Sequence, residues 1–157
     1  MSLDSILSWL ETSFAARAMA SSVWAYPVVE ILHMVSIVLV VGTSALIDFR
    51  LIGWRLRSMT VAELATELAP WTRAGIIGIL MTGPLLFVTD PDRYVDNFYF
   101  RLKMTCLLLT ILFDLFVARR LRMTGSTAGE SQQRFAGGIS LLLWAGVVTG
   151  GRGIGIF

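Results

Sequence analysis

The residues of this chain that are best suited to chemistry lie near one end of two long apolar segments. Glu30 and His33 are three residues apart, so on a helix both side chains leave the same face. Lys103 opens a later apolar segment. A carboxylate, an imidazole and an ammonium group that converge can hold a metal, pair with an anionic group of a cofactor, or transfer a proton. Because His33 is the only histidine, any such chemistry that needs imidazole must use it.

These residues belong to two polar stripes, each on one face of a predicted helix. Charged groups are costly in lipid, so we expect the stripes to face the interior of a bundle and to meet there. The outer cluster would then combine Glu30, His33 and Lys103 with Arg101 or Arg152. The inner cluster would place Asp48 and Asp114 beside Arg73 or Arg119, where simple anchoring of helix ends is the favoured interpretation. The first stripe is Glu30, His33, Ser44 and Asp48, within about 60° of the helical wheel, and the second is Lys103, Thr110 and Asp114, within about 40°.

Composition indicates that lipid surrounds these helices. The 157 residues are 55% hydrophobic and only 15% charged, whereas soluble domains carry about 25% charged residues. A net charge of +2 with arginines in the loops is not typical of nucleic-acid binding. The single cysteine, Cys106, excludes a disulfide within the chain. No phosphate-binding loop, nucleophile elbow or C-x-x-C motif is present.

The elements that must position the site are four membrane helices. We predict an all-α integral membrane four-helix bundle over residues 23–157, preceded by an amphipathic interfacial segment over residues 1–22. The amphipathic segment is indicated by Leu3, Ile6, Leu7 and Leu10, spaced as on one helix face. A kink or local break is expected at Gly83-Pro84. The predicted spans are 27–47, 71–88, 100–117 and 135–149, each near the ~20 residues that cross a bilayer.

The distribution of basic residues predicts the orientation. Eight arginines flank two loops, and five basic residues lie on the other side together with five aspartates or glutamates. The positive-inside rule places the two arginine-rich loops in the cytoplasm and both termini outside. We therefore expect a multi-pass protein of the bacterial cytoplasmic (inner) membrane, whose first membrane helix acts as its signal. The eight arginines are Arg50, Arg55, Arg57, Arg73, Arg119, Arg120, Arg122 and Arg134.

Small residues follow one face of the second span and cluster in the fourth. Close packing of helices is the favoured interpretation of such faces. The alternative is that they leave room for a planar ligand such as a porphyrin or a quinone. The residues are Gly75, Gly78, Thr82 and Thr89 in the second span, and Gly137, Gly138, Gly146, Gly150 and Gly151 in or near the fourth.

Four stretches of the chain resemble a known group of proteins. They are WAYPVVEILHMVSIVLVVGTSALIDFRLIG, PWTRAGIIGILMTGPLLF, NFYFRLKM and LLLWAGVVTGGRGI, within about residues 22–155. They resemble an uncharacterised bacterial family of small four-helix membrane proteins, distantly similar to the copper-resistance-D membrane domain and to the HemJ-type protoporphyrinogen oxidase. The resemblance to HemJ implies that His33 and Lys103 take part in binding haem b. The chain departs from that pattern because Arg101 stands where those proteins often have a histidine, and it has no second histidine.

Two classes of function remain open. The first is a haem- or quinone-associated redox protein, in which His33 acts as ligand or proton acceptor and Glu30 accepts a hydrogen bond from its ring. Lys103 or Arg101 would pair with an anionic group of the cofactor, and a redox partner would exchange electrons. The alternative is a non-enzymatic protein for proton or ion transport, or for structure and assembly. Besides the lipid bilayer, a homo-oligomeric partner is expected, and whether the protein is an enzyme stays open.

Overall fold

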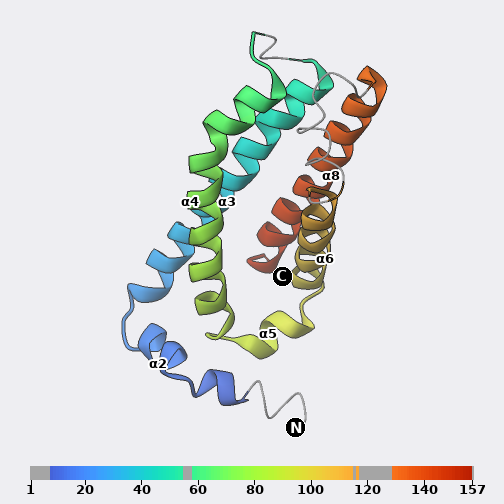
Figure 1. Ribbon diagram of the computed structural model, residues 1–157. Coiled ribbons are helices and arrows are strands. Elements are labelled where there is room, and N and C mark those ends of the chain that lie inside the picture. Colours follow the sequence, from blue (N-terminus) through green and yellow to red (C-terminus); the bar gives the residue numbers. More distant parts are fainter. Residues whose placement is uncertain (1–7, 55–57, 115, 117–128, 157) are drawn as a thin grey trace.

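The computed structural model describes residues 8–54, 58–114, 116 and 129–156, and every regular element within them is a helix (Figure 1). The all-α fold class is therefore confirmed. Two short helices, α2 and α5, lie at one end of the molecule, and four longer helices run away from them. The elements are α2 (Phe14–Ala20), α3 (Ala25–Ile52), α4 (Val61–Phe87), α5 (Pro91–Asp96), α6 (Phe98–Phe113) and α8 (Glu130–Ile154).

Local sequence signals explain where three of these helices begin or end. Helix α3 ends at Gly53, whose φ of +84° is accessible to glycine at little cost. Helix α4 begins with a capping box, in which the Thr60 hydroxyl accepts from the Glu63 N–H and the Glu63 carboxylate accepts from the Thr60 N–H. Helix α6 begins at Phe98 and is capped by Asn97, whose side chain accepts from two backbone N–H groups of the first turn.

The long helices pack as two pairs, α3 with α4 and α6 with α8, and α3 also packs on α8. Glycines allow these close approaches. A Cβ at Gly75 of α4 would lie 2.8 Å from the backbone oxygen of Ser36 on α3. A Cβ at Gly137 of α8 would lie 2.8 Å from the backbone oxygen of Asp48. Along these contacts, the small-residue faces of the sequence therefore serve helix packing.

Two helices of the described residues, α3 and α8, are long and apolar enough to cross a membrane. All four long helices differ in extent from the predicted spans, and three of them are longer. Helix α4 begins ten residues before the predicted start at residue 71. Helix α6 ends at Phe113, before the predicted end at residue 117, which lies outside the described residues.

Of the kink or local break expected at Gly83-Pro84, the break is absent from the described structure, because α4 continues through Pro84 to Phe87. A proline removes only one hydrogen bond from a helix, and the flanking turns maintain the rest. Part of the amphipathic segment over residues 1–22 forms α2, while Leu3, Ile6 and Leu7 lie outside the described residues. Five of the arginines that predicted the orientation also lie outside them: Arg55, Arg57, Arg119, Arg120 and Arg122.

Candidate functional site

Three side chains from three helices meet near the end of the molecule that carries α5. The Nδ1 atom of His33, on α3, lies 2.8 Å from the hydroxyl oxygen of Thr82, on α4. The Nε2 atom of the same ring lies 3.5 Å from Nζ of Lys103, on α6. His33 thus connects the two helix pairs, and both nitrogens of its ring have a partner. We call these three residues the His33 cluster.

Hydrogen-bond accounting fixes the tautomer of the neutral imidazole. The Thr82 hydroxyl has one proton, which it donates to the backbone oxygen of Gly78 at 2.6 Å. The Thr82 oxygen must then accept at its contact with His33, so Nδ1 carries the ring proton. The lone pair of the ring therefore lies on Nε2, and Lys103 donates to it. An acceptor and a cationic donor thus stand side by side.

Packing holds the cluster in place. Thr82 is 7% exposed, and His33 is half-buried. The missing side chain of Gly83 leaves space beside the imidazole, since a Cβ there would lie 3.6 Å from Cε1 of His33. On the other side, Gly150 packs against the backbone of Lys103, where a Cβ would lie 2.9 Å from its nitrogen. The backbone of α6 at Lys103 is therefore in close contact with α8.

The contact of Glu30 with His33 that was expected from the sequence is absent among the described residues. Thr82 is the partner of Nδ1, and the Glu30 carboxylate makes no hydrogen bond or ion pair with any described residue. Glu30 is half-buried on the same helix, one turn before His33. The i, i+3 spacing permitted a contact, but an interhelical hydroxyl at 2.8 Å takes that place.

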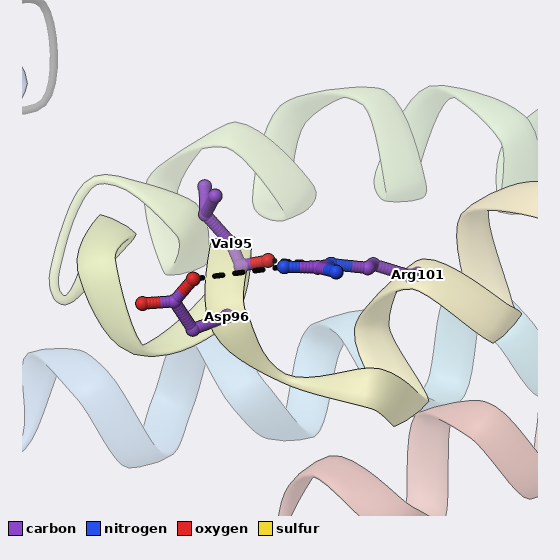
Figure 2. A network of polar contacts seen from close by, with 3 residues as sticks. All are labelled: Val95, Asp96 and Arg101. Atoms are coloured by element: carbon purple, nitrogen blue, oxygen red, sulfur yellow. Dashed lines mark hydrogen bonds and ion pairs between the residues drawn. The ribbon is translucent and has the colours of Figure 1, made fainter. Parts of the chain in front are cut away.

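Arg101 does not join the His33 cluster either. Its Nε donates to the backbone oxygen of Val95 at 2.9 Å, and its guanidinium lies 3.6 Å from the carboxylate of Asp96 (Figure 2). Both contacts fasten α6 to the last turn of α5, and the Arg101 side chain is 65% exposed. Arg101 precedes Lys103 by two residues, about 200° around the helix, so the two side chains leave opposite faces.

The inner end of the polar stripes lies far along the helices from the His33 cluster. Asp48 is 2% exposed, near the end of α3, and Asp114 follows the last residue of α6. Thr110, between Lys103 and Asp114, is buried, and its hydroxyl donates to the backbone oxygen of Cys106 at 2.7 Å. The second stripe therefore does turn inward at Thr110, as predicted.

An aromatic group closes the end of the molecule next to the His33 cluster. The ring centroids of Phe87, Tyr94 and Phe100 lie 5.6–6.0 Å apart in each pair. These residues come from α4, α5 and α6, so α5 joins the ends of the two helices that carry Thr82 and Lys103. Burial, together with a hydrogen bond to Tyr26, raises the pKa of Tyr94. Tyr94 therefore stays a neutral hydrogen-bonding phenol at physiological pH.

Sequence analysis did not identify the role of Thr82, which it placed only on a small-residue face. The pairing of His33 with Lys103 was predicted from the two polar stripes, and Lys103 is the only lysine of the chain. Among the described residues, no three His, Cys, Asp or Glu side chains gather as a metal-binding group. A metal at this cluster would therefore depend on His33 as its one imidazole ligand.

Comparison with known proteins places the chain in a family without assigning an activity. No curated protein and no solved structure matches the chain. A link to the copper-resistance-D domain or to HemJ therefore does not emerge from these comparisons. One family model, described as a family of unknown function (DUF6644), matches residues 6–157, which is nearly the whole chain. The chain belongs to this uncharacterised family.

Proposed function

We propose that the chain crosses the bacterial inner membrane four times, through α3, α4, α6 and α8, with both termini outside. The apolar side chains of α4 and α6 support the two additional spans. Leu80 and Met81 on α4 are 68% and 67% exposed, and Leu108 on α6 is 57% exposed. Such surfaces are costly in water and suit lipid. Helix α2 and the end of α8 lie at the same end of the molecule, in keeping with an even number of crossings (Figure 1).

We infer further that the protein belongs to a redox system of the membrane and binds a quinone at the His33 cluster. The observation that carries this proposal is the contact between Nε2 of His33 and Nζ of Lys103. A quinol hydroxyl can donate to Nε2 and accept from Nζ at the same time. A quinone carbonyl can only accept, and therefore uses Lys103 alone. The site should for this reason bind the reduced form more tightly than the oxidised form.

Access from lipid supports a ligand that is itself dissolved in the membrane. Within the described residues, α4 and α6 belong to different helix pairs and do not pack closely against each other. Thr82 and Lys103 therefore lie where the two helix pairs adjoin, next to the aromatic group of Phe87, Tyr94 and Phe100. A quinone ring can approach this boundary sideways from the bilayer without crossing water. His33 and Lys103 would then bind its oxygen, and Thr82 would keep the imidazole in the required tautomer.

Haem b is the second candidate cofactor, and the same contact weighs against it. Nε2 is the atom that would ligate iron, but the ammonium group of Lys103 stands 3.5 Å in front of it. With one histidine in the chain, a second axial ligand would have to be a different residue type or come from another subunit. A quinol hydroxyl needs only that the hydrogen bond between Lys103 and His33 open, because it then donates to Nε2 and accepts from Nζ, so both groups keep a partner. The geometry therefore favours quinone over haem.

The transport alternative has less support from the contacts. Buried hydroxyls do follow α3 between His33 and Asp48, namely Ser36 and Thr43. Each of them donates to a backbone oxygen one turn earlier on α3. Thr43 also accepts from Thr72 of α4 at 2.9 Å. These bonds join helices and use the hydroxyl protons, so the hydroxyls have a structural role that needs no transported ion.

The test is a comparison of thermal unfolding with and without a short-chain benzoquinol. At a quinol concentration of about 100 times Kd, binding should stabilise the protein by about 2.7 kcal/mol. For a chain of this size that corresponds to a rise in Tm of about 5–10 °C. His33→Ala and Lys103→Met should lose this rise, and Thr110→Val, a buried substitution outside the cluster, should keep it. Equal protection of all four proteins would refute the site, and a haem Soret band in the purified wild type would favour haem.

A further inference from the structure

A second candidate binding site lies between the start of α6 and the end of α8, about one helical turn from Lys103. A cavity of about 400 Å³ is lined there by Tyr99 of α6 and by five residues at the end of α8. Its volume is within the range of about 300–1,000 Å³ that is typical of small-molecule sites. Apart from Arg152, Thr149 and the hydroxyl of Tyr99, the lining is apolar. The residues are Tyr99, Val148, Thr149, Arg152, Gly153 and Ile156.

Two polar side chains of this cavity, Arg152 and Thr149, lack a partner among the described residues. The guanidinium of Arg152 makes no hydrogen bond or ion pair with them, and neither does the Thr149 hydroxyl. The lack of a hydrogen bond from the Thr149 hydroxyl is unusual for a helical threonine in the described part of this chain. Six others donate to the backbone oxygen one turn earlier: Thr43, Thr66, Thr72, Thr82, Thr105 and Thr110.

Thr149 and Arg152 can act on one ligand. They are three residues apart on α8, about 60° around the helix and about 4.5 Å along it. A cation and a free hydroxyl at that spacing suit the oxygens of a phosphodiester. The apolar lining beside them, Val148 and Ile156 with the ring of Tyr99, suits an acyl chain. None of the six lining residues is acidic, so a cationic headgroup gains no ion pair here.

We propose that this cavity binds an anionic phospholipid, with its phosphate on Arg152 and Thr149 and an acyl chain along the apolar lining. The position of the cavity fits such a ligand. It lies at the end of α6 and α8 where α5 joins the bundle, which is a membrane boundary if the four helices cross the bilayer (Figure 1). An arginine at a membrane boundary gains about fivefold in affinity for an anionic lipid surface. The proposal does not depend on a quinone at the His33 cluster.

Binding is tested with the full chain in detergent, by native mass spectrometry and by thermal unfolding. Phosphatidylglycerol should be retained and should raise Tm, and phosphatidylcholine should do so at least about fivefold more weakly. Arg152→Gln should weaken phosphatidylglycerol binding by about fivefold or more. Arg93→Gln is the matched control, because Arg93 is also exposed, lies on α5 at the same end and is not part of the cavity. It should bind phosphatidylglycerol as the wild type does.

A second variant keeps the test independent of charge. Thr149 is exposed, so Thr149→Trp should fill the cavity, leave Tm of the lipid-free protein unchanged and abolish retention of phosphatidylglycerol. The proposal is overturned if Arg152→Gln and Arg93→Gln retain the lipid equally. It is also overturned if inorganic phosphate protects the protein as well as the lipid does. A dimer mass that disappears in Thr149→Trp would identify a second copy of the chain as the occupant instead.

Discussion

The hydrogen bond between Thr82 and His33 can be isolated by a matched pair of substitutions, Thr82→Val and Thr110→Val. Both threonines are buried, at 7% and 4% exposed, and both donate to the backbone oxygen one turn earlier. Valine removes that local bond equally in the two variants. Only Thr82→Val also removes the acceptor of the Nδ1–H group of His33. The difference between the variants therefore reports the interhelical bond.

The expected size of the difference follows from the burial of the donor. Hydrogen bonds between membrane helices contribute about 0.6 kcal/mol on average and up to about 1.7 kcal/mol. Leaving a buried donor without an acceptor costs about 1–3 kcal/mol. Because His33 is half-buried, we expect Thr82→Val to be less stable than Thr110→Val by about 1–2 kcal/mol. For a chain of this size, that is about 2–8 °C in Tm.

Two measurements check this expectation in detergent-solubilised protein. Thermal unfolding gives the difference in Tm, and ¹⁵N NMR of the single imidazole gives its tautomer directly. The wild type and Thr110→Val should show a protonated, hydrogen-bonded Nδ1, and Thr82→Val should shift the Nδ1 resonance as this hydrogen bond is lost, while Lys103 keeps Nε2 unprotonated. Equal melting of the two variants, or a wild-type ring protonated at Nε2, would refute the assignment of Thr82 as the acceptor.

Three other predictions concern packing, capping and orientation. In chemical unfolding, Gly150→Ala should destabilise the protein by about 1–3 kcal/mol, because its Cβ would lie 2.9 Å from backbone atoms of α6. Gly138→Ala should stabilise the protein by about 0.5–1 kcal/mol, because the space beside Gly138 is open. Glu63 lies outside the predicted span, and its hydrogen bonds with Thr60 lower its pKa. Its contribution to folding stability should therefore be complete above its ordinary pKa of 4.5 and be lost as pH falls through the lowered pKa. The stability difference from Glu63→Gln should shrink over that range, and a difference independent of pH would contradict it. A reporter fused after Phe157 should be active outside the cytoplasm, and activity only inside would reverse the orientation.

The sequence was sufficient to predict the fold class and one contact of the site. Long apolar segments and their caps predict helices, because both signals are local. The pairing of His33 with Lys103 was expected from the polar stripes, since each charged group in lipid needs a partner. The sequence also indicates that Arg101 lies outside the His33 cluster, because its offset of two residues from Lys103 places it on the opposite face of α6.

The partner of Nδ1 could not be predicted, because it depends on how α4 packs against α3. Periodicity placed Thr82 on a small-residue face but not its height relative to His33. That height is set by Gly75 and Gly78, which let α4 approach α3 closely. Glu30 was the local candidate, and the tertiary contact with Thr82 displaced it. The local break, one of the two alternatives expected at Gly83-Pro84, is absent for a related reason, since helix continuity depends on the surrounding turns and not on one residue.

The most direct test of the proposed function is the ¹⁵N spectrum of His33 during addition of a short-chain benzoquinol. The imidazole is unique in the chain, so the signals need no assignment by mutation. Binding as proposed should shift the Nε2 resonance as it accepts the quinol proton in a hydrogen bond, and Nδ1 should keep its proton for Thr82. Nε2 and Nδ1 resonances that stay unchanged at saturating quinol, with Tm also unchanged, would contradict a quinone site at His33.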